Sequence, residues 1–243
     1  MAKLDGKVAI VTGGGSGIGE GIALALAAEG VSVVICGRRA SSLARVVEAI
    51  RAAGGTARAV TADVSREDDV ARVVAETVDA FGTVHILVNN AGVDAPDAPI
   101  HEYSIEEWDR VMAINLRGPF LMARAVLPPM RRQREGHILN ISSEAGLEYY
   151  DESGAYTVSK FGLNALGELI QLENQSHGIR VNTICPGMVL TEMSEGAPGL
   201  DRRRCLYPAD IADLALWLLT RRANIKIGRP ILIQTMLNPW EGK

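Results

Sequence analysis

A tyrosine and a lysine four residues apart, with a serine upstream, are the residues of this 243-residue chain best suited to chemistry. Tyr156 and Lys160 lie near the start of a long helical pattern, and their spacing places both side chains on one helix face. A free tyrosine has a pKa of about 10 and is a poor acid or base at neutral pH. A neighbouring ammonium favours the phenolate, so we expect Lys160 to lower the pKa of Tyr156 toward a working range.

Ser143 follows the apolar run from His137 to Ser142, which is read as a strand. Its hydroxyl is therefore expected at the carboxyl end of that strand, next to the start of the Tyr156 helix. A hydroxyl that polarises an oxygen, a phenol that supplies a proton and a fixed cation together suit carbonyl reduction. The Tyr-x-x-x-Lys spacing alone is more typical of a surface or packing pair, so the rest of the chain must support the chemistry.

A glycine-rich turn between a strand and a helix provides that support. The apolar run Val8–Val11 leads into Thr12–Gly19, and a helical pattern continues to about Glu29. Glycines let the backbone approach a pyrophosphate, and a helix N-terminus offers free N–H groups. The spacing differs from G-x-G-x-x-G, and a flexible turn is the alternative. We predict nucleotide binding by the turn residues Gly13, Gly15, Ser16, Gly17, Ile18 and Gly19.

The end of the second predicted strand indicates which dinucleotide is bound. Val31–Cys36 is followed by Gly37, Arg38 and Arg39, with no acidic residue to hydrogen-bond a ribose 2′-hydroxyl. Arginine binds phosphate bidentately. The sequence therefore favours NADP(H) over NAD(H), and a solvated basic turn is the alternative.

Two polar residues have open roles. Asp63 could reach the adenine amine or cap the next helix through Ser65 and Asp68. The Gly118-Pro119 pair is expected to kink or break a long helix near Asn115. Asn115 could bond the backbone groups freed there or hold a water for the active site, and position alone favours the structural role.

Strands alternate with helices along the whole chain, and no linker divides it. We predict the α/β class, with one doubly wound domain over residues 1–243 and a seven-stranded parallel sheet covered by helices on both faces. Residues 192–207 are rich in Gly and Pro and lack a clear period, which predicts a mobile substrate segment.

The composition of the chain argues against several classes of binding partner. A formal charge of −4 argues against nucleic acid, and no apolar run reaches membrane length. The N-terminus enters a strand directly, so no signal peptide is expected. Three widely spaced cysteines fit a reducing cytoplasm and give no disulfide or metal pattern. We expect a cytoplasmic protein with no metal, no membrane partner and a small-molecule substrate.

Seven motifs in register, over about Leu4 to Gln234, resemble the short-chain dehydrogenase/reductase family and its NADP-preferring members. They are Thr12–Gly19, Asp63-Val64, Asn89–Gly92, Asn115, Ser143, Tyr156-x-x-x-Lys160, and Pro186-Gly187 with Thr191. The resemblance implies a Rossmann-like fold in which Tyr156 is the acid or base and Ser143 holds the substrate oxygen. It also implies that Lys160 tunes Tyr156 and binds the nicotinamide ribose, and that Asn115 positions a water.

The same resemblance implies further cofactor contacts. These are Asp63, Val64, Asn90, Ala91, Gly92, Tyr156, Lys160, Pro186, Gly187, Val189 and Thr191. Two departures stand out: His85 replaces a usual aspartate and is read as a local hydrogen-bonding change, and an atypical tail follows Gln234.

We therefore expect an oxidoreductase that transfers a hydride between NADP(H) and a carbonyl or alcohol. An epimerase or dehydratase on the same fold and a non-catalytic nucleotide-binding regulator are the alternatives. The acidic residues near Tyr150 and the basic run Arg202–Arg204 indicate opposite substrate charges, so the substrate stays open. The apolar region Pro119–Pro129 predicts a homo-oligomer, and the resemblance implies a tetramer or else a dimer.

Overall fold

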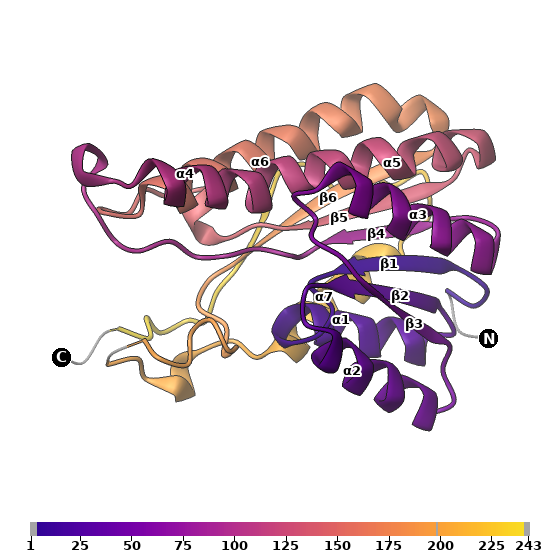
Figure 1. Ribbon diagram of the computed structural model, residues 1–243, viewed down its shortest axis with the longest axis horizontal. Coiled ribbons are helices and arrows are strands. Elements are labelled where there is room, and N and C mark those ends of the chain that lie inside the picture. Colours follow the sequence, from indigo (N-terminus) through magenta and orange to yellow (C-terminus); the bar gives the residue numbers. More distant parts are fainter. Residues whose placement is uncertain (1–3, 198, 241–243) are drawn as a thin grey trace.

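The computed structural model describes residues 4–197 and 199–240, which form a seven-stranded parallel sheet with helices on both faces (Figure 1). The strand order is β3-β2-β1-β4-β5-β6-β7. The strands are β1 (Val8–Thr12), β2 (Ser32–Gly37), β3 (Ala57–Thr61), β4 (Ile86–Asn89), β5 (Gly136–Ile141), β6 (Ile179–Pro186) and β7 (Ile231–Ile233). The predicted α/β class and doubly wound sheet are confirmed.

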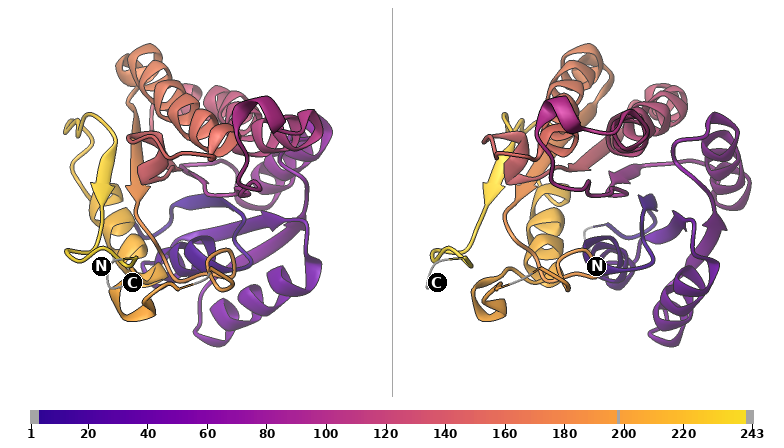
Figure 2. Two further views of the ribbon diagram at one scale, coloured as in Figure 1. Left: turned by 90° about the vertical axis from the view of Figure 1, so that its left-hand side faces the viewer. Right: turned by 60° about the vertical axis from the view of Figure 1, so that its left-hand side comes forward.

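Helices divide between the two faces of the sheet (Figures 1 and 2). One face carries α1 (Gly17–Ala28), α2 (Ala40–Ala52) and α7 (Pro208–Leu219). The other carries α3 (Glu67–Phe81), α4 (Ile105–Met112), α5 (Gly118–Gln133) and α6 (Gly154–Asn174). Within the described residues, none of these helices combines the length and apolar character needed to cross a bilayer.

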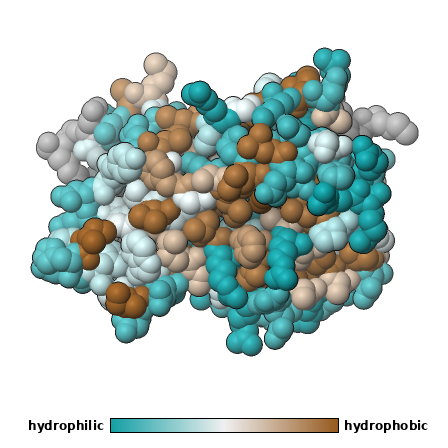
Figure 3. Space-filling model, turned by 90° about the horizontal axis from the view of Figure 1, so that it is seen from above, coloured by the Kyte–Doolittle hydropathy of each residue, from teal (hydrophilic) through white to brown (hydrophobic). Residues whose placement is uncertain are grey.

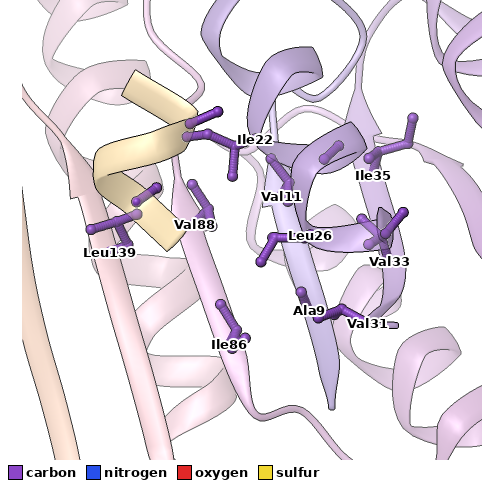
Figure 4. Close-up of a cluster of buried hydrophobic side chains, with 14 of the residues drawn as sticks. Ala9, Val11, Ile22, Leu26, Val31, Val33, Ile35, Ile86, Val88 and Leu139 are labelled. Atoms are coloured by element: carbon purple, nitrogen blue, oxygen red, sulfur yellow. The ribbon is translucent and has the colours of Figure 1, made fainter. Parts of the chain in front are cut away.

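The central strand β1 packs against helices on both sides. Val11 belongs to the core that includes Ile22 and Leu26 of α1 (Figure 4), whereas Ile10 belongs to the core that includes Met122 of α5. Successive side chains of a strand point to opposite faces, so a strand covered on both faces must be apolar throughout. This requirement explains why the continuous apolar run in β1 was recognisable from sequence.

The long helix near Asn115 is neither broken nor ended by the Gly-Pro pair. Ala113–Arg117 form a π-helical turn between α4 and α5, and the flanking residues keep right-handed helical backbone angles. A π turn widens the hydrogen-bonded ring by one residue. Pro119 lies in the first turn of α5, where a missing N–H is tolerated. The irregularity was predicted at the right place, but its form differs.

The C-terminal part departs furthest from the sequence expectation. The seventh of the predicted strands is short, because only Ile231–Ile233 pair with β6. The segment 192–207 is tied to its surroundings: Leu190 N donates to Leu206 O at 2.8 Å, and Asp201 N donates to Pro239 O at 3.0 Å. Its mobility stays a prediction. Residue 198 of this segment, and residues 1–3 and 241–243 of the predicted domain, lie outside the described residues.

Replacing the fully buried Leu26 by alanine tests the core. Leu26 is 0% exposed, so Leu26→Ala should lower the free energy of unfolding by about 2–5 kcal/mol through lost burial and a cavity. Urea titration measures the change. Leu24→Ala, on the same helix and 37% exposed, is the control and should cost less than about 1 kcal/mol. Equal losses in both variants would contradict this packing.

Candidate active site

A cleft opens at the carboxyl ends of β1 and β4, where the strand order reverses direction. The chain leaves β1 toward α1 on one face and leaves β4 toward α4 on the other, which separates the two connections. The cavity between them has a volume of about 360 Å³. The glycine turn, the ends of β2, β3 and β4, and the side chains of Tyr156 and Lys160 line it.

The Thr12 hydroxyl connects the two strands at this point. Its Oγ1 accepts hydrogen bonds from the backbone N–H groups of Asn90 and Ala91, each at 3.0 Å, and donates to Val88 O at 3.2 Å. Asn90 Nδ2 in turn donates to Thr12 O at 2.9 Å and to Gly13 O at 3.3 Å. Asn90 therefore positions the glycine turn as well as lining the cleft. Sequence reasoning missed Thr12, although its place directly before the glycines was a signal.

The glycine turn is shaped to hold a diphosphate. Gly13 and Gly17 have φ values of +65° and +55°, a region that favours glycine. A Cβ on Gly19 would lie 2.4 Å from Gly13 O and from Asn90 Nδ2, so the turn and α1 can approach only without it. Helix α1 begins at Gly17 and directs its first N–H groups at the turn. This backbone cradle fits the diphosphate of a dinucleotide.

Most of the predicted turn residues line the cavity. Gly13, Gly15, Ser16, Gly17 and Ile18 do so, whereas Gly19 packs against Gly13 behind the cavity wall.

The part of the cleft beyond the end of β2 contains both predicted arginines. Arg38 and Arg39 line the cavity, and Arg39 Nη2 contacts Ser16 Oγ at 3.0 Å and Glu192 Oε2 at 2.7 Å. Sequence reasoning missed several lining residues whose types carry no signature. They are Gly37, Ser42, Leu43, Ala62, Val93, Ile114, Ile141, Ser142 and Glu192.

Asp63 adopts the local role that the sequence left open. Its Oδ1 accepts from Ser65 N at 2.9 Å and from Ser65 Oγ at 2.7 Å, which forms the turn before α3. The residue at the N-cap position of α3 is Arg66, and Asp69 rather than Asp68 completes the turn by accepting from Asp63 N. Asp63 and Val64 also line the cavity, and the adenine contact expected of Asp63 stays a prediction.

The three residues expected to do chemistry lie together. Tyr156 and Lys160 come from the first turns of α6, and Lys160 Nζ lies 5.4 Å from the Tyr156 ring centre. Lys160 Nζ also donates to Ile141 O at 3.1 Å. Ser143 lies just beyond β5, where its Oγ accepts from Ala145 N at 3.2 Å, and it is close enough to the Tyr156 phenol to act on the pKa of that group.

The pKa values differ from the sequence expectation. Burial raises the pKa of Tyr156 to about 12, the hydrogen bond with Ser143 opposes this rise, and the carboxylates of Asp94 and Glu144 add to it. Burial also lowers the pKa of Lys160 to about 8. The expectation that Lys160 gives Tyr156 a low pKa is therefore wrong for the protein alone. Desolvation disfavours both the Tyr156 phenolate and the Lys160 ammonium, and the spacing of the two residues in the sequence does not predict how deeply they are buried.

Asn115 fills a structural position inside the π turn. Its Oδ1 accepts from Val93 N at 2.8 Å, and its Nδ2 donates to Val93 O at 2.9 Å and to Ser159 Oγ at 3.2 Å. The side chain is 1% exposed. These bonds fix the segment after Gly92 against α6. The role is structural, but its backbone partner is Val93 and not a group freed at the helix interruption. The role of holding a water stays a prediction.

The residues expected near the nicotinamide are divided between the cavity wall and the layer behind it. Ala91, Gly92 and Thr191 line the cavity. Pro186 ends β6, Gly187 N donates to Ile233 O at 2.8 Å, and Val189 is buried beside Leu206. These three support the segment that presents Thr191.

His85 lies at the opposite ends of the strands from the cleft. Its Nδ1 accepts from Val8 N at 3.1 Å, as the interpretation of a local hydrogen bond requires.

Replacing Lys160 tests the cost of burying its ammonium. The folded pKa of about 8 lies below the ordinary 10.5, so the folded protein is destabilised wherever the unfolded chain is protonated. Without cofactor at neutral pH, Lys160→Met should raise the free energy of unfolding by about 1–3 kcal/mol. This advantage should be constant below pH 8 and vanish by pH 10.5. Urea titrations across pH measure it; the exposed Lys226→Met is the control, and a destabilised Lys160→Met would refute the argument.

Comparison with known proteins agrees with this geometry. A family model described as short chain dehydrogenase matches residues 7–198. An uncharacterized oxidoreductase of Staphylococcus saprophyticus is 38% identical over 231 residues, covering 93% of this chain and 97% of the relative. Another, from Staphylococcus epidermidis, is 34% identical over 227 residues, covering 93% of this chain and 96% of the relative.

Solved structures share the fold over nearly the whole chain. A metagenomic short-chain oxidoreductase in complex with NADP is 37% identical, with a TM-score of 0.85 and coverage of 97% of this chain and 100% of that one. An alcohol dehydrogenase from the archaeon Thermococcus sibiricus, complexed with 5-hydroxy-NADP, is 26% identical, with a TM-score of 0.87 and coverage of 98% of both chains. The family match, the relatives and the shared fold together show that this chain belongs to the short-chain dehydrogenase/reductase family of oxidoreductases.

Proposed function

We propose that the protein reversibly transfers a hydride between NADP(H) and a carbonyl or alcohol substrate. One observation carries the proposal: the Tyr156 phenol, in contact with Ser143 and near Lys160, lines the same cavity as the glycine turn. The proton donor and the diphosphate cradle thus share one cleft, as a reductase requires.

The residues divide the work of reduction. A bound nicotinamide supplies the hydride, and the protein supplies position, charge and proton. Ser143 donates a hydrogen bond to the substrate oxygen as negative charge develops there. Tyr156 then transfers its phenol proton to that oxygen, and Lys160 stabilises the resulting phenolate. Asn115 positions a water for the return of the proton.

The raised pKa of Tyr156 bears on how the phenol acts in the cleft. A phenol with a pKa raised to about 12 is protonated at neutral pH, so in the free protein Tyr156 holds the proton that reduction needs. It is also a weaker acid than a free tyrosine, so its pKa must fall before it donates the proton readily. We expect the charge of Lys160 to contribute to that fall once the dinucleotide is bound.

The cofactor preference rests on the adenosine end of the cleft. Arg38 and Arg39 follow β2 and line the cavity, where guanidinium groups can bind a 2′-phosphate. Two structural relatives are solved with NADP or 5-hydroxy-NADP, which supports the same preference. NAD(H) is the less favoured alternative.

We further propose that the protein acts in the cytoplasm as a homo-oligomer, a tetramer or a dimer. Apolar side chains lie among polar ones on the face formed by α4, α5 and α6 (Figure 3). The exposed apolar residues on these helices are Ile105, Phe120, Val158, Leu169 and Leu172. Such a face can be covered by a second copy of the chain.

A substrate panel tests the reaction class. NADPH oxidation is followed by its near-ultraviolet absorbance with ketones, aldehydes and oxidised sugars, and alcohol oxidation is followed with NADP. Consumption with one substrate class supports the proposal. NADPH binding without turnover across the panel would favour an epimerase, a dehydratase or a regulatory protein.

Removing the phenol hydroxyl tests the proton donor. Tyr156→Phe should lower kcat by about 10²–10⁴, the usual contribution of a general acid, while the Kd for NADPH stays within about threefold. Steady-state kinetics and nucleotide fluorescence measure the two effects. Tyr149→Phe is the control because Tyr149 is 83% exposed. A Tyr156→Phe enzyme that kept most of its kcat would exclude Tyr156 as the proton donor.

Reversing the charge at Arg38 tests the cofactor preference. Arg38→Asp should raise the KM for NADPH at least about tenfold, because a phosphate contact becomes a repulsion, and should change the KM for NADH little. Arg132→Asp, exposed at the far end of α5, gives the same change in net charge away from the cleft. Unchanged NADPH kinetics in Arg38→Asp would remove the argument for a 2′-phosphate site.

A further inference from the structure

An ion pair joins two distant parts of the chain across the cleft. Arg39 Nη2 lies 2.7 Å from Glu192 Oε2, although the residues are 153 positions apart. Arg39 follows β2, Glu192 follows Thr191 beyond β6, and both line the cavity. The carboxylate therefore occupies one of the two arginines that the proposed function assigns to a 2′-phosphate.

Glu192 is presented from a hydrogen-bonded turn. Ser194 Oγ accepts from Thr191 N at 3.0 Å and lies 2.8 Å from Val189 O. Ser194 is 7% exposed, so this turn is anchored in the protein. The turn therefore places the backbone of Glu192 where its carboxylate can reach Arg39.

The arginines near the cleft differ in whether a carboxylate already binds them. Arg45 donates to Gly15 O of the glycine turn at 3.2 Å, and both of its terminal nitrogens bind Glu20, at 2.6 and 2.7 Å. Within residues 4–197 and 199–240, Arg38 has no hydrogen-bond or ion-pair partner and is free to meet an anion. Arg39 is the cleft arginine already bound to a carboxylate from the substrate segment.

We propose that Glu192 competes with the 2′-phosphate of NADPH for Arg39 and thereby limits the preference for NADPH over NADH. The inference rests on the proposed function. A guanidinium binds a carboxylate or a phosphate with the same donors, so the incoming phosphate must displace the carboxylate. The carboxylate also repels the two phosphate charges, whereas the 2′-hydroxyl of NADH meets no such repulsion.

The expected effect is modest because the ion pair is exposed. The two side chains are 57% and 58% exposed, and exposed pairs are weak. Removing the carboxylate should therefore tighten NADPH binding about two- to fivefold. It should not change NADPH binding by orders of magnitude.

The test compares two neutral glutamine variants of the full chain. Glu192→Gln removes the charge beside Arg39, and Glu195→Gln removes an exposed charge three residues further along the same segment. Nucleotide fluorescence gives the Kd for NADPH and for NADH without turnover. We expect the Kd for NADPH to fall about two- to fivefold in Glu192→Gln alone, and the Kd for NADH to change less.

A double-mutant cycle with Arg39 shows whether Arg39 mediates the effect of Glu192 on NADPH binding. Combined with Arg39→Gln, the Glu192→Gln change should lose most of its benefit, because the contested guanidinium is gone. Unchanged or weaker NADPH binding in Glu192→Gln would overturn the inference, and weaker binding would mean that Glu192 holds Arg39 in place for the phosphate. A wild-type protein that binds neither dinucleotide would instead defeat the proposed function and the inference with it.

Discussion

The arrangement of the site depends on the junction of β1 and β4, where the chain departs to opposite faces of the sheet. Thr12 Oγ1 holds this junction by accepting two backbone N–H groups from the end of β4. The connections that follow β1 and β4 run to opposite faces of the sheet. Their divergence leaves a cavity at the carboxyl ends of the two strands. The glycines after Thr12 keep the backbone at the cavity wall. Tyr156 can share this cavity because β5, which precedes its helix, lies directly beside β4.

The buried pair of Tyr156 and Lys160 lowers the stability of the free protein. Burial raises the pKa of Tyr156 to about 12 and lowers the pKa of Lys160 to about 8, so the surroundings disfavour the charged form of each. The Lys160 ammonium donates to the Ile141 carbonyl. A carbonyl offers less compensation than a carboxylate would. Placing an ammonium there is unfavourable for folding, which is a usual signature of a functional position.

The irregular helix and the atypical tail show where local rules reach their limit. Gly118 and Pro119 signalled an interruption near Asn115, but a break, a kink and a π turn all accommodate a proline without an N–H. Packing decided among them: Asn115 bonds to Val93 on one side and to Ser159 of α6 on the other. The tail after β7 is likewise held by hydrogen bonds with Asp201 and Arg204, which a strand pattern cannot anticipate.

Sequence alone determined the α/β class, the glycine turn and the identity of Tyr156 and Lys160 as a pair. Each of these depends on periods or spacings within a few residues, because buried strands must be apolar and a spacing of four repeats a helix face. The tertiary structure alone decided that Glu192 meets Arg39 across 153 positions and that the Tyr156 pKa rises. Partners brought together through space and desolvation depend on how the whole chain packs, and no local pattern encodes them.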